Sequence, residues 1–268
     1  MLPLRDRNPT RRRPYVTWAI IAVCVAVYFF VQERPGATDI VAVEGVGAVQ
    51  IDREIRFTLE YAAVPCEITQ GRPLTVREVA ETFGQDEREA CDATASGPRL
   101  FPDKQVWLAV LTSTFLHGSL LHLGGNMLYL WIFGNNIEDH LGHVAYAFFY
   151  LVSGIVAALA HIAAQPDSTL PVVGASGAIA GVMGAYLVWF PRAPVTTVLL
   201  IIIPIITVVD AVWLLGIWFV SQFFTAPDSA VAWVAHVAGF VFGAFVGLIV
   251  RISHPARKVV WRGTGGRW

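Results

Sequence analysis

Residues 174–190 read GASGAIAGVMGAYLVWF, and this stretch decides the fold class. It contains no charged residue and lies in an apolar segment of residues 172–190. A hydrocarbon core about 30 Å thick needs roughly 20 such residues at about 1.5 Å each. Gly177, Gly181 and Gly184 fall on one side of the helix, and such small residues let two membrane helices pack closely. The stretch predicts a membrane helix that carries one hydroxyl, Ser176, near its start.

The composition of the whole chain supports a membrane protein. Of its 268 residues, 55% are hydrophobic and only 15% are charged, and the mean hydropathy is +0.57. Soluble domains carry about 25% charged residues, so an ordinary water-soluble enzyme and a disordered chain are both excluded. We expect an all-α membrane protein with six transmembrane helices, near residues 15–31, 119–136, 144–164, 172–190, 206–224 and 231–250.

Charge predicts the topology of these helices. Residues 1–15 carry a net charge of +4 and residues 251–268 a net charge of +5, whereas residues 33–104 carry −6. Because Lys and Arg concentrate on the cytoplasmic side, both termini should be cytoplasmic. We therefore expect a basic N-terminus (1–14), a membrane domain (15–250) that contains a long extracytoplasmic loop (32–104), and a basic tail (251–268). The predicted location is the inner membrane of a bacterium.

Two apolar runs are too long for single upright helices. Pro204 interrupts residues 194–224, and a proline inside a helix costs about 3 kcal/mol. We expect residues 195–203 to form an interfacial or re-entrant stretch, with the fifth helix starting near Ile206 and Asp210 near the cytoplasmic boundary. Residues 105–136 should break at 117–119, with a short outer helix over 105–116 and Ser119 as the N-cap of the second span.

Polar residues inside the spans point to one functional site, because lipid makes them costly. His122 and Asn126 share a face of the second span, Ser176 lies about five residues into the fourth, and His236 lies in the sixth. His122, Ser176 and His236 should all lie roughly 6–9 Å below the outer surface. Histidine can take a proton from a serine nucleophile, and His122, Asn126 and the Ser176 N–H can donate to an oxyanion.

These motifs resemble the rhomboid family of intramembrane serine proteases. The matching segments are residues 117–118 (HG), 122–126 (HLGGN), 174–177 (GASG) and 235–239 (AHVAG), and residues 60–65 (EYAAVP) resemble the family's segment after its first span. The resemblance implies a six-helix fold, a Ser176–His236 dyad without a carboxylate, and an oxyanion site of His122 and Asn126. It also implies that the substrates are single-pass transmembrane proteins.

Two features depart from the family pattern. The stretch 32–106 lacks the Trp-Arg pair that the family often carries there. Ala180 stands where some relatives have a tyrosine one turn after the serine.

Other functions stay open at the level of sequence. The main alternative is a non-catalytic rhomboid-like protein that binds or escorts membrane proteins, although such relatives usually lack the serine or the histidine. A transporter would normally show inverted repeats, and none is evident. We expect no cofactor, no metal and no nucleic-acid partner. The expected partners are the lipid bilayer and the single-pass transmembrane substrates. The remaining histidines should be interfacial or surface residues: His117, His140, His143, His161 and His254.

The three cysteines give separate expectations. Cys24 lies in the first span and should be a free packing residue. Cys66 and Cys91 lie in the loop assigned to the outside, where a disulfide can form, and the alternative is two free thiols. They enclose residues 67–90, which contain many Glu and Arg residues and little apolar surface on which to fold.

Overall fold

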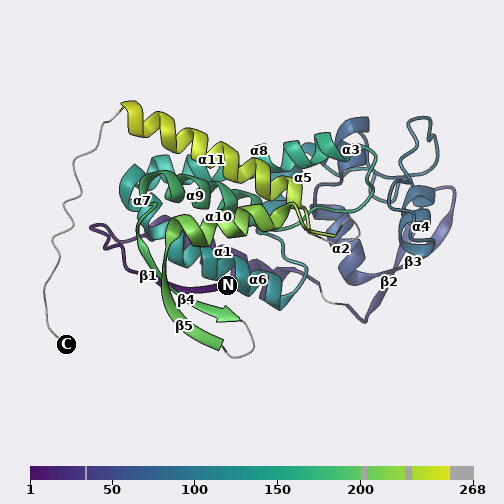
Figure 1. The fold of residues 1–268 in the computed structure, drawn as a ribbon. Helices are drawn as coiled ribbons and strands as arrows, with labels where there is room; N and C mark the ends of the chain where they lie inside the picture. The colour runs from purple at the N-terminus through teal and green to yellow at the C-terminus, as the bar shows by residue number, and fades with distance from the viewer. Residues whose placement is uncertain (34, 201–203, 227–230, 254–268) are drawn as a thin grey trace, which may run out of the picture.

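The computed structural model describes residues 1–33, 35–200, 204–226 and 231–253 (Figure 1). His254 and most of the predicted basic tail lie outside these ranges, as does part of the expected re-entrant stretch 195–203. The described residues are mostly helical, but they also include two small antiparallel sheets. An all-α fold is therefore wrong in detail.

Each of the six predicted apolar segments overlaps a helix. These are α1 (Tyr15–Ala26) with the π-helical turn η1 (Val27–Val31), α6 (Leu120–Tyr129) continued by η3 (Leu130–Gly134) and α7 (Asn135–Leu141), α8 (His143–Ala164), α9 (Ser176–Trp189), α10 (Ala211–Gln222) and α11 (Trp233–Ser253).

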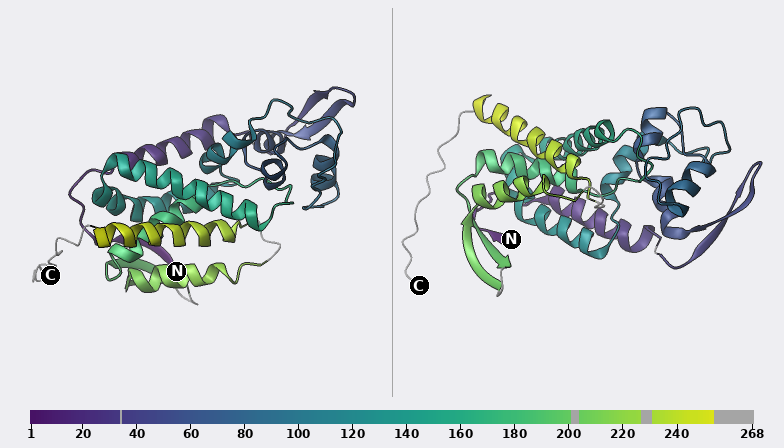
Figure 2. Two further views of the ribbon diagram at one scale, coloured as in Figure 1. Left: turned by 90° about the horizontal axis from the view of Figure 1, so that it is seen from above. Right: turned by 45° about the vertical axis from the view of Figure 1, so that its right-hand side comes forward.

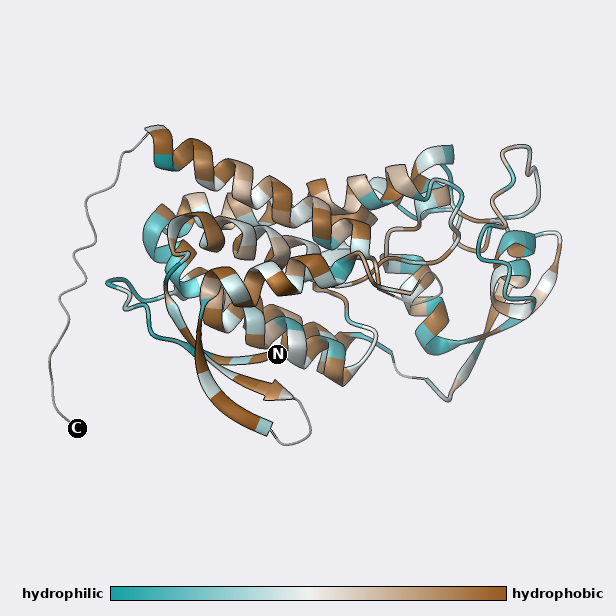
Figure 3. Ribbon diagram, in the orientation of Figure 1, coloured by the Kyte–Doolittle hydropathy of each residue, from teal (hydrophilic) through white to brown (hydrophobic). Residues whose placement is uncertain are grey.

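Length and apolarity identify fewer spans than the predicted six. Among the described residues, only α8 and α11 are individually long and apolar enough to cross a membrane. The bent pair formed by Val106–Phe115 and Leu120–Leu141 makes a third candidate. The helices over Tyr15–Val31, Ser176–Trp189 and Ala211–Gln222 are apolar but shorter. Figure 3 shows hydrophobic residues along these helices, so the described chain has the character of an integral membrane protein with two or three candidate spans.

The predicted break before the second span is confirmed. A short helix, α5 (Val106–Thr112), and a 3₁₀ turn, η2 (Ser113–Phe115), precede α6, and the two helical parts meet at 77°. The hydroxyl of Ser119 caps α6, because its oxygen accepts a hydrogen bond from the His122 N–H at 3.0 Å.

The predicted start of the fifth helix near Ile206 is wrong. Strands β4 (Pro194–Leu200) and β5 (Pro204–Asp210) pair in this region, and α10 begins only at Ala211. This run is rich in Val, Ile and Thr, whose branched side chains favour strands. The N-terminal strand β1 (Leu2–Asp6) pairs with β4 and completes a sheet of order β1-β4-β5.

The long loop is itself folded. It contains the hairpin β2 (Thr38–Val43) and β3 (Gly47–Asp52), followed by α2 (Arg53–Tyr61), α3 (Pro65–Gln70) and α4 (Val76–Gly84). Figures 1 and 2 show these elements toward one end of the helices and the three-stranded sheet toward the other. The loop has a small buried core of its own, which includes Val43, Leu59, Val64, Leu74 and Leu100.

The disulfide prediction is confirmed, and the loop folds more fully than its composition suggested. Cys66 and Cys91 are bonded, with their Cα atoms 5.7 Å apart, and Cys24 is a buried free thiol. Between the bonded cysteines the carboxylate of Glu78, only 1% exposed, pairs with the Arg72 guanidinium at 2.7 Å. Inside residues 67–90 this ion pair therefore adds to the apolar contacts of Leu74.

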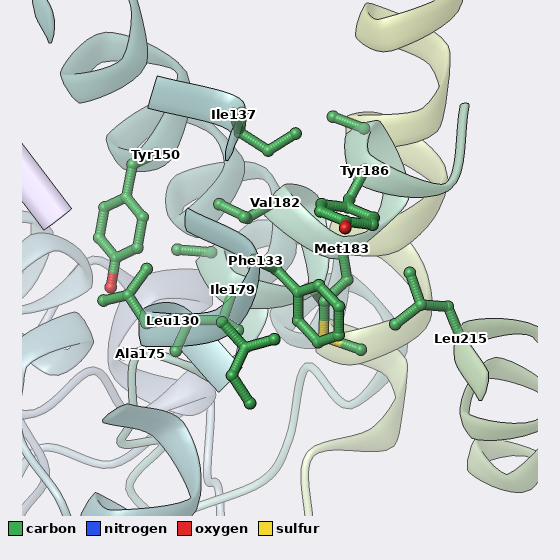
Figure 4. Close-up of a cluster of buried hydrophobic side chains, with 14 of the residues drawn as sticks. Leu130, Phe133, Ile137, Tyr150, Ala175, Ile179, Val182, Met183, Tyr186 and Leu215 are labelled. Atoms are coloured by element: carbon green, nitrogen blue, oxygen red, sulfur yellow. The ribbon is translucent and has the colours of Figure 1, made fainter. Parts of the chain in front are cut away.

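The glycine residues of α9 and α11 allow these two helices to touch along their backbones. A Cβ added to Gly239 or Gly243 would overlap the carbonyl oxygen of Gly177 or Gly181. On its other side, Gly177 leaves room for Ala157 of α8, whose Cβ would lie only 2.6 Å from an added methyl group. Figure 4 shows the apolar core beside this contact, where Ile179, Val182, Met183 and Tyr186 of α9 pack among residues of neighbouring helices.

Candidate functional site

Ser176 is the first residue of α9, so the expectation that it lies about five residues into the helix is wrong. The chain reaches it through Gly174, whose φ of +124° is a conformation that favours glycine. Two hydrogen bonds hold the approach to the helix: Gly174 N–H donates to the Ser113 carbonyl at 2.9 Å, and Val172 N–H donates to the Ala63 carbonyl at 2.8 Å. The folded loop therefore contacts the segment that positions the serine.

His236 lies in the first turn of α11 and faces Ser176. Its Nε2 is 2.8 Å from the Ser176 Oγ, within hydrogen-bond distance. The two residues are 60 positions apart in the chain, and the glycine contact between α9 and α11 brings them together. A hydroxyl beside an imidazole nitrogen is the arrangement in which histidine can act as a base toward serine.

The other ring nitrogen of His236 has a partner that the sequence analysis missed. Its Nδ1 lies 2.7 Å from Oε1 of Gln222, the last residue of α10. The other site residues were identified because polar groups are costly inside apolar spans. Gln222 shows the same pattern, since it is a polar amide at the end of a mostly apolar helix.

His122 and Asn126 lie beside the turn that precedes Ser176. A Cβ built on Gly174 would be 2.8 Å from His122 Nε2 and 3.7 Å from Asn126 Nδ2, so both side chains reach this turn. The Nδ2 of Asn126 is buried and has no hydrogen-bond partner among the described residues. A buried amide left without a partner is costly, which is consistent with a donor kept for a bound group.

The remaining histidines fall into two groups. His140 is exposed and stacks on Trp189, and His143 is half-buried beside Glu138, so neither belongs to the site. His117 and His161 are buried, so a surface location is wrong for these two. The His117 ring packs against the His122 ring with centroids 5.2 Å apart. His254 lies outside the described residues.

The described residues contain one group spaced closely enough to hold a metal, formed by Cys66, Glu78 and Cys91. Because these cysteines form the disulfide, they cannot supply the thiolates that bind metals. This group lies in the folded loop and contributes none of the residues around Ser176.

A family model described as "Rhomboid domain" matches residues 103–253, which is more than half of the chain. Rhomboid protein 1, mitochondrial, of Saccharomyces cerevisiae is 29% identical over 170 residues, covering 60% of this chain and 47% of that protein. Presenilin-associated rhomboid-like protein, mitochondrial, of Bos taurus is 32% identical over 93 residues, 34% of this chain and 25% of that one.

A bacterial protein is also similar. Rhomboid protease GluP of Bacillus subtilis is 38% identical over 81 residues, 30% of this chain and 15% of that one. The chain spans about half the length or less of these curated relatives.

Proposed function

Since the chain belongs to the rhomboid family, we propose that it is an intramembrane serine endopeptidase in which Ser176 is the nucleophile and His236 the general base. The observation that supports this most directly is the 2.8 Å contact between Ser176 Oγ and His236 Nε2, made across two apolar helices. A serine hydroxyl and a histidine are costly groups inside a membrane domain, and their pairing gives them a chemical use.

The proposed reaction follows the chemistry of these groups. The Ser176 oxygen attacks the carbonyl carbon of the scissile peptide bond while its proton moves to His236 Nε2. His122, Asn126 and the Ser176 N–H donate hydrogen bonds to the oxyanion that forms. His236 then gives its proton to the departing amine as the peptide bond breaks. A water molecule next attacks the acyl carbon while His236 takes a proton from it, and His236 returns that proton to the Ser176 oxygen as the ester bond breaks.

Single-pass transmembrane proteins are the proposed substrates. A transmembrane helix hides its carbonyl groups in internal hydrogen bonds, so the scissile segment has to enter as extended chain. Gly, Pro or polar residues in the outer part of the substrate's span would make this opening easier, with a small residue at the cleavage point. No cofactor, metal or nucleic acid takes part in the proposed reaction.

The proposal includes a six-helix bundle with both termini on the cytoplasmic side. The basic residues near the N-terminus support this orientation, and the Cys66–Cys91 disulfide supports an oxidising compartment for the folded loop. The inner membrane of a bacterium, with both termini in the cytoplasm, is the proposed location. Two of the relatives described above have the word mitochondrial in their names. The bacterial location is therefore a proposal separate from membership of the family.

Labelling with a fluorophosphonate–rhodamine probe tests the proposed function. The folded, detergent-solubilised protein should form a covalent adduct at Ser176, and Ser176→Ala and His236→Ala should not react. Because the two residues act as one unit, the double variant should be scarcely worse than either single variant. Labelling of Ser176→Ala at the wild-type rate, or absence of labelling in the folded wild type, would overturn the proposal. The second result would favour a non-catalytic protein that binds membrane clients.

A further inference from the structure

Gln222 contacts the nitrogen of His236 that does not face the serine. The residue is 8% exposed, and its side chain reaches from the end of α10 to α11. Its Oε1 lies 2.7 Å from His236 Nδ1. Neither the serine chemistry nor the oxyanion site uses this amide, so its role is separate from those proposed above.

Two further contacts fix which way the amide of Gln222 points. Its other terminal atom lies 3.0 Å from the Trp218 carbonyl oxygen and 3.3 Å from the Ser221 Oγ. A backbone carbonyl only accepts hydrogen bonds, so the atom that faces it must be the NH₂ group. The amide oxygen therefore faces His236.

This orientation selects one tautomer of the histidine. An amide oxygen only accepts, so the His236 Nδ1 must carry the hydrogen and donate it to Gln222. In the neutral ring the lone pair is then on Nε2, the nitrogen that faces the Ser176 Oγ at 2.8 Å. The same hydrogen bond persists after Nε2 takes the serine proton, because Nδ1 keeps its hydrogen throughout.

We propose that Gln222 is a positioning residue that holds His236 in the tautomer and orientation needed to act as base. This inference rests on the proposed function, because it assigns Gln222 to the same Ser176–His236 pair. It makes the site a chain of three side chains from α9, α11 and α10, with a neutral amide in the place where many serine hydrolases have a carboxylate. The Trp218 ring, 5.8 Å from the His236 ring, packs beside this chain.

Saturation kinetics of fluorophosphonate–rhodamine labelling test the role of Gln222. In this reaction the Ser176 oxygen forms a bond to phosphorus, fluoride leaves, and His236 accepts the serine proton. Gln222→Met keeps the length of the side chain but removes the acceptor. The maximal labelling rate should fall by about 10- to 100-fold while the probe concentration for half-maximal rate changes less than about threefold. Gln222→Glu keeps an acceptor oxygen at the same reach and should restore most of the rate.

Controls separate this inference from the proposed function. Gln105→Met makes the same chemical change at an exposed position and should label like the wild type. If Gln222→Met lowers the unfolding temperature, Gln222→Asn replaces it, since its amide is one methylene too short to reach Nδ1 and should cause the same loss of rate. Wild-type labelling rates in Gln222→Met and Gln222→Asn would overturn the role of Gln222. A rate for Gln222→Glu as low as that of Gln222→Met would overturn it as well. Only an unreactive wild type or a reactive Ser176→Ala would overturn the proposed function.

Discussion

Replacing Gly243 by alanine should force α9 and α11 apart, and with them Ser176 and His236. A Cβ on Gly243 would lie 2.6 Å from the Gly181 Cα and closer still to the Gly181 carbonyl oxygen. Ordinary non-bonded contacts between carbon atoms are about 3.5–4.0 Å, so the two helices must separate locally by about 1 Å or more. The atoms in the way belong to the backbone, and no side-chain rotation can relieve the overlap.

The size of the effect follows from this displacement. Overpacking of this kind costs about 1–3 kcal/mol, while the better helix propensity of alanine returns about 1 kcal/mol. The unfolding temperature should therefore fall by only a few degrees, at roughly 2–4 °C per kcal/mol for a protein of this size. The 2.8 Å hydrogen bond between Ser176 and His236 would lengthen beyond about 3.5 Å, so the rate of fluorophosphonate labelling should fall by at least about 100-fold.

The assay combines labelling rate with thermal unfolding in detergent. Gly216→Ala is the matched control, because Gly216 lies in α10 with no neighbouring atom within 4 Å of an added Cβ. It should label at the wild-type rate and be as stable as the wild type or slightly more so. A Gly243→Ala protein that labels at the wild-type rate and unfolds at the wild-type temperature would refute the argument that close backbone contact holds the two side chains together.

Three further predictions concern the oxyanion donors and the folded loop. Asn126→Ala should lower the turnover of a transmembrane substrate by about 10²- to 10³-fold without abolishing it, and an unchanged rate would remove Asn126 from the oxyanion site. Opening the Cys66–Cys91 disulfide should destabilise the loop by about 3 kcal/mol and make it sensitive to limited proteolysis, whereas full alkylation of both cysteines without reductant would show that the bond is absent. Burial alone would raise the pKa of Glu78, but hydrogen bonds from Arg72 and from backbone N–H groups lower it from 4.5 to about 2. Its carboxylate therefore contributes stability that is fully present above about pH 4.5 and is lost as the pH falls toward 2. Pepsin should cut the loop increasingly over that range relative to a Glu78→Gln variant assayed at each pH, and parallel profiles for the two proteins would contradict this.

Local sequence determined most of the helices and the chemistry of the candidate site. Runs of apolar residues predict membrane helices because a helix satisfies its backbone hydrogen bonds within a single segment, as lipid requires. The cap at Ser119 and the break before it were also predictable from local sequence. The Ser119 hydroxyl and the N–H group that it caps are only three residues apart in the chain. The polar residues Ser176 and His236 were identifiable because they are costly inside apolar helices.

The tertiary structure decided what depends on segments far apart in the chain. Strand β4 pairs with β1 across nearly 200 residues, and its apolar sequence suits a membrane interface as well as a strand, so the sheet was not predictable. The position of Ser176 at the start of α9, the burial of Glu78 beside Arg72 and the contact between Gln222 and His236 likewise depend on how separate elements pack. Local patterns report which surfaces are apolar and which groups are polar. The partner that each polar group finds is set only when the helices meet, because hydrogen bonds require distances near 3 Å that no sequence spacing between different helices can specify.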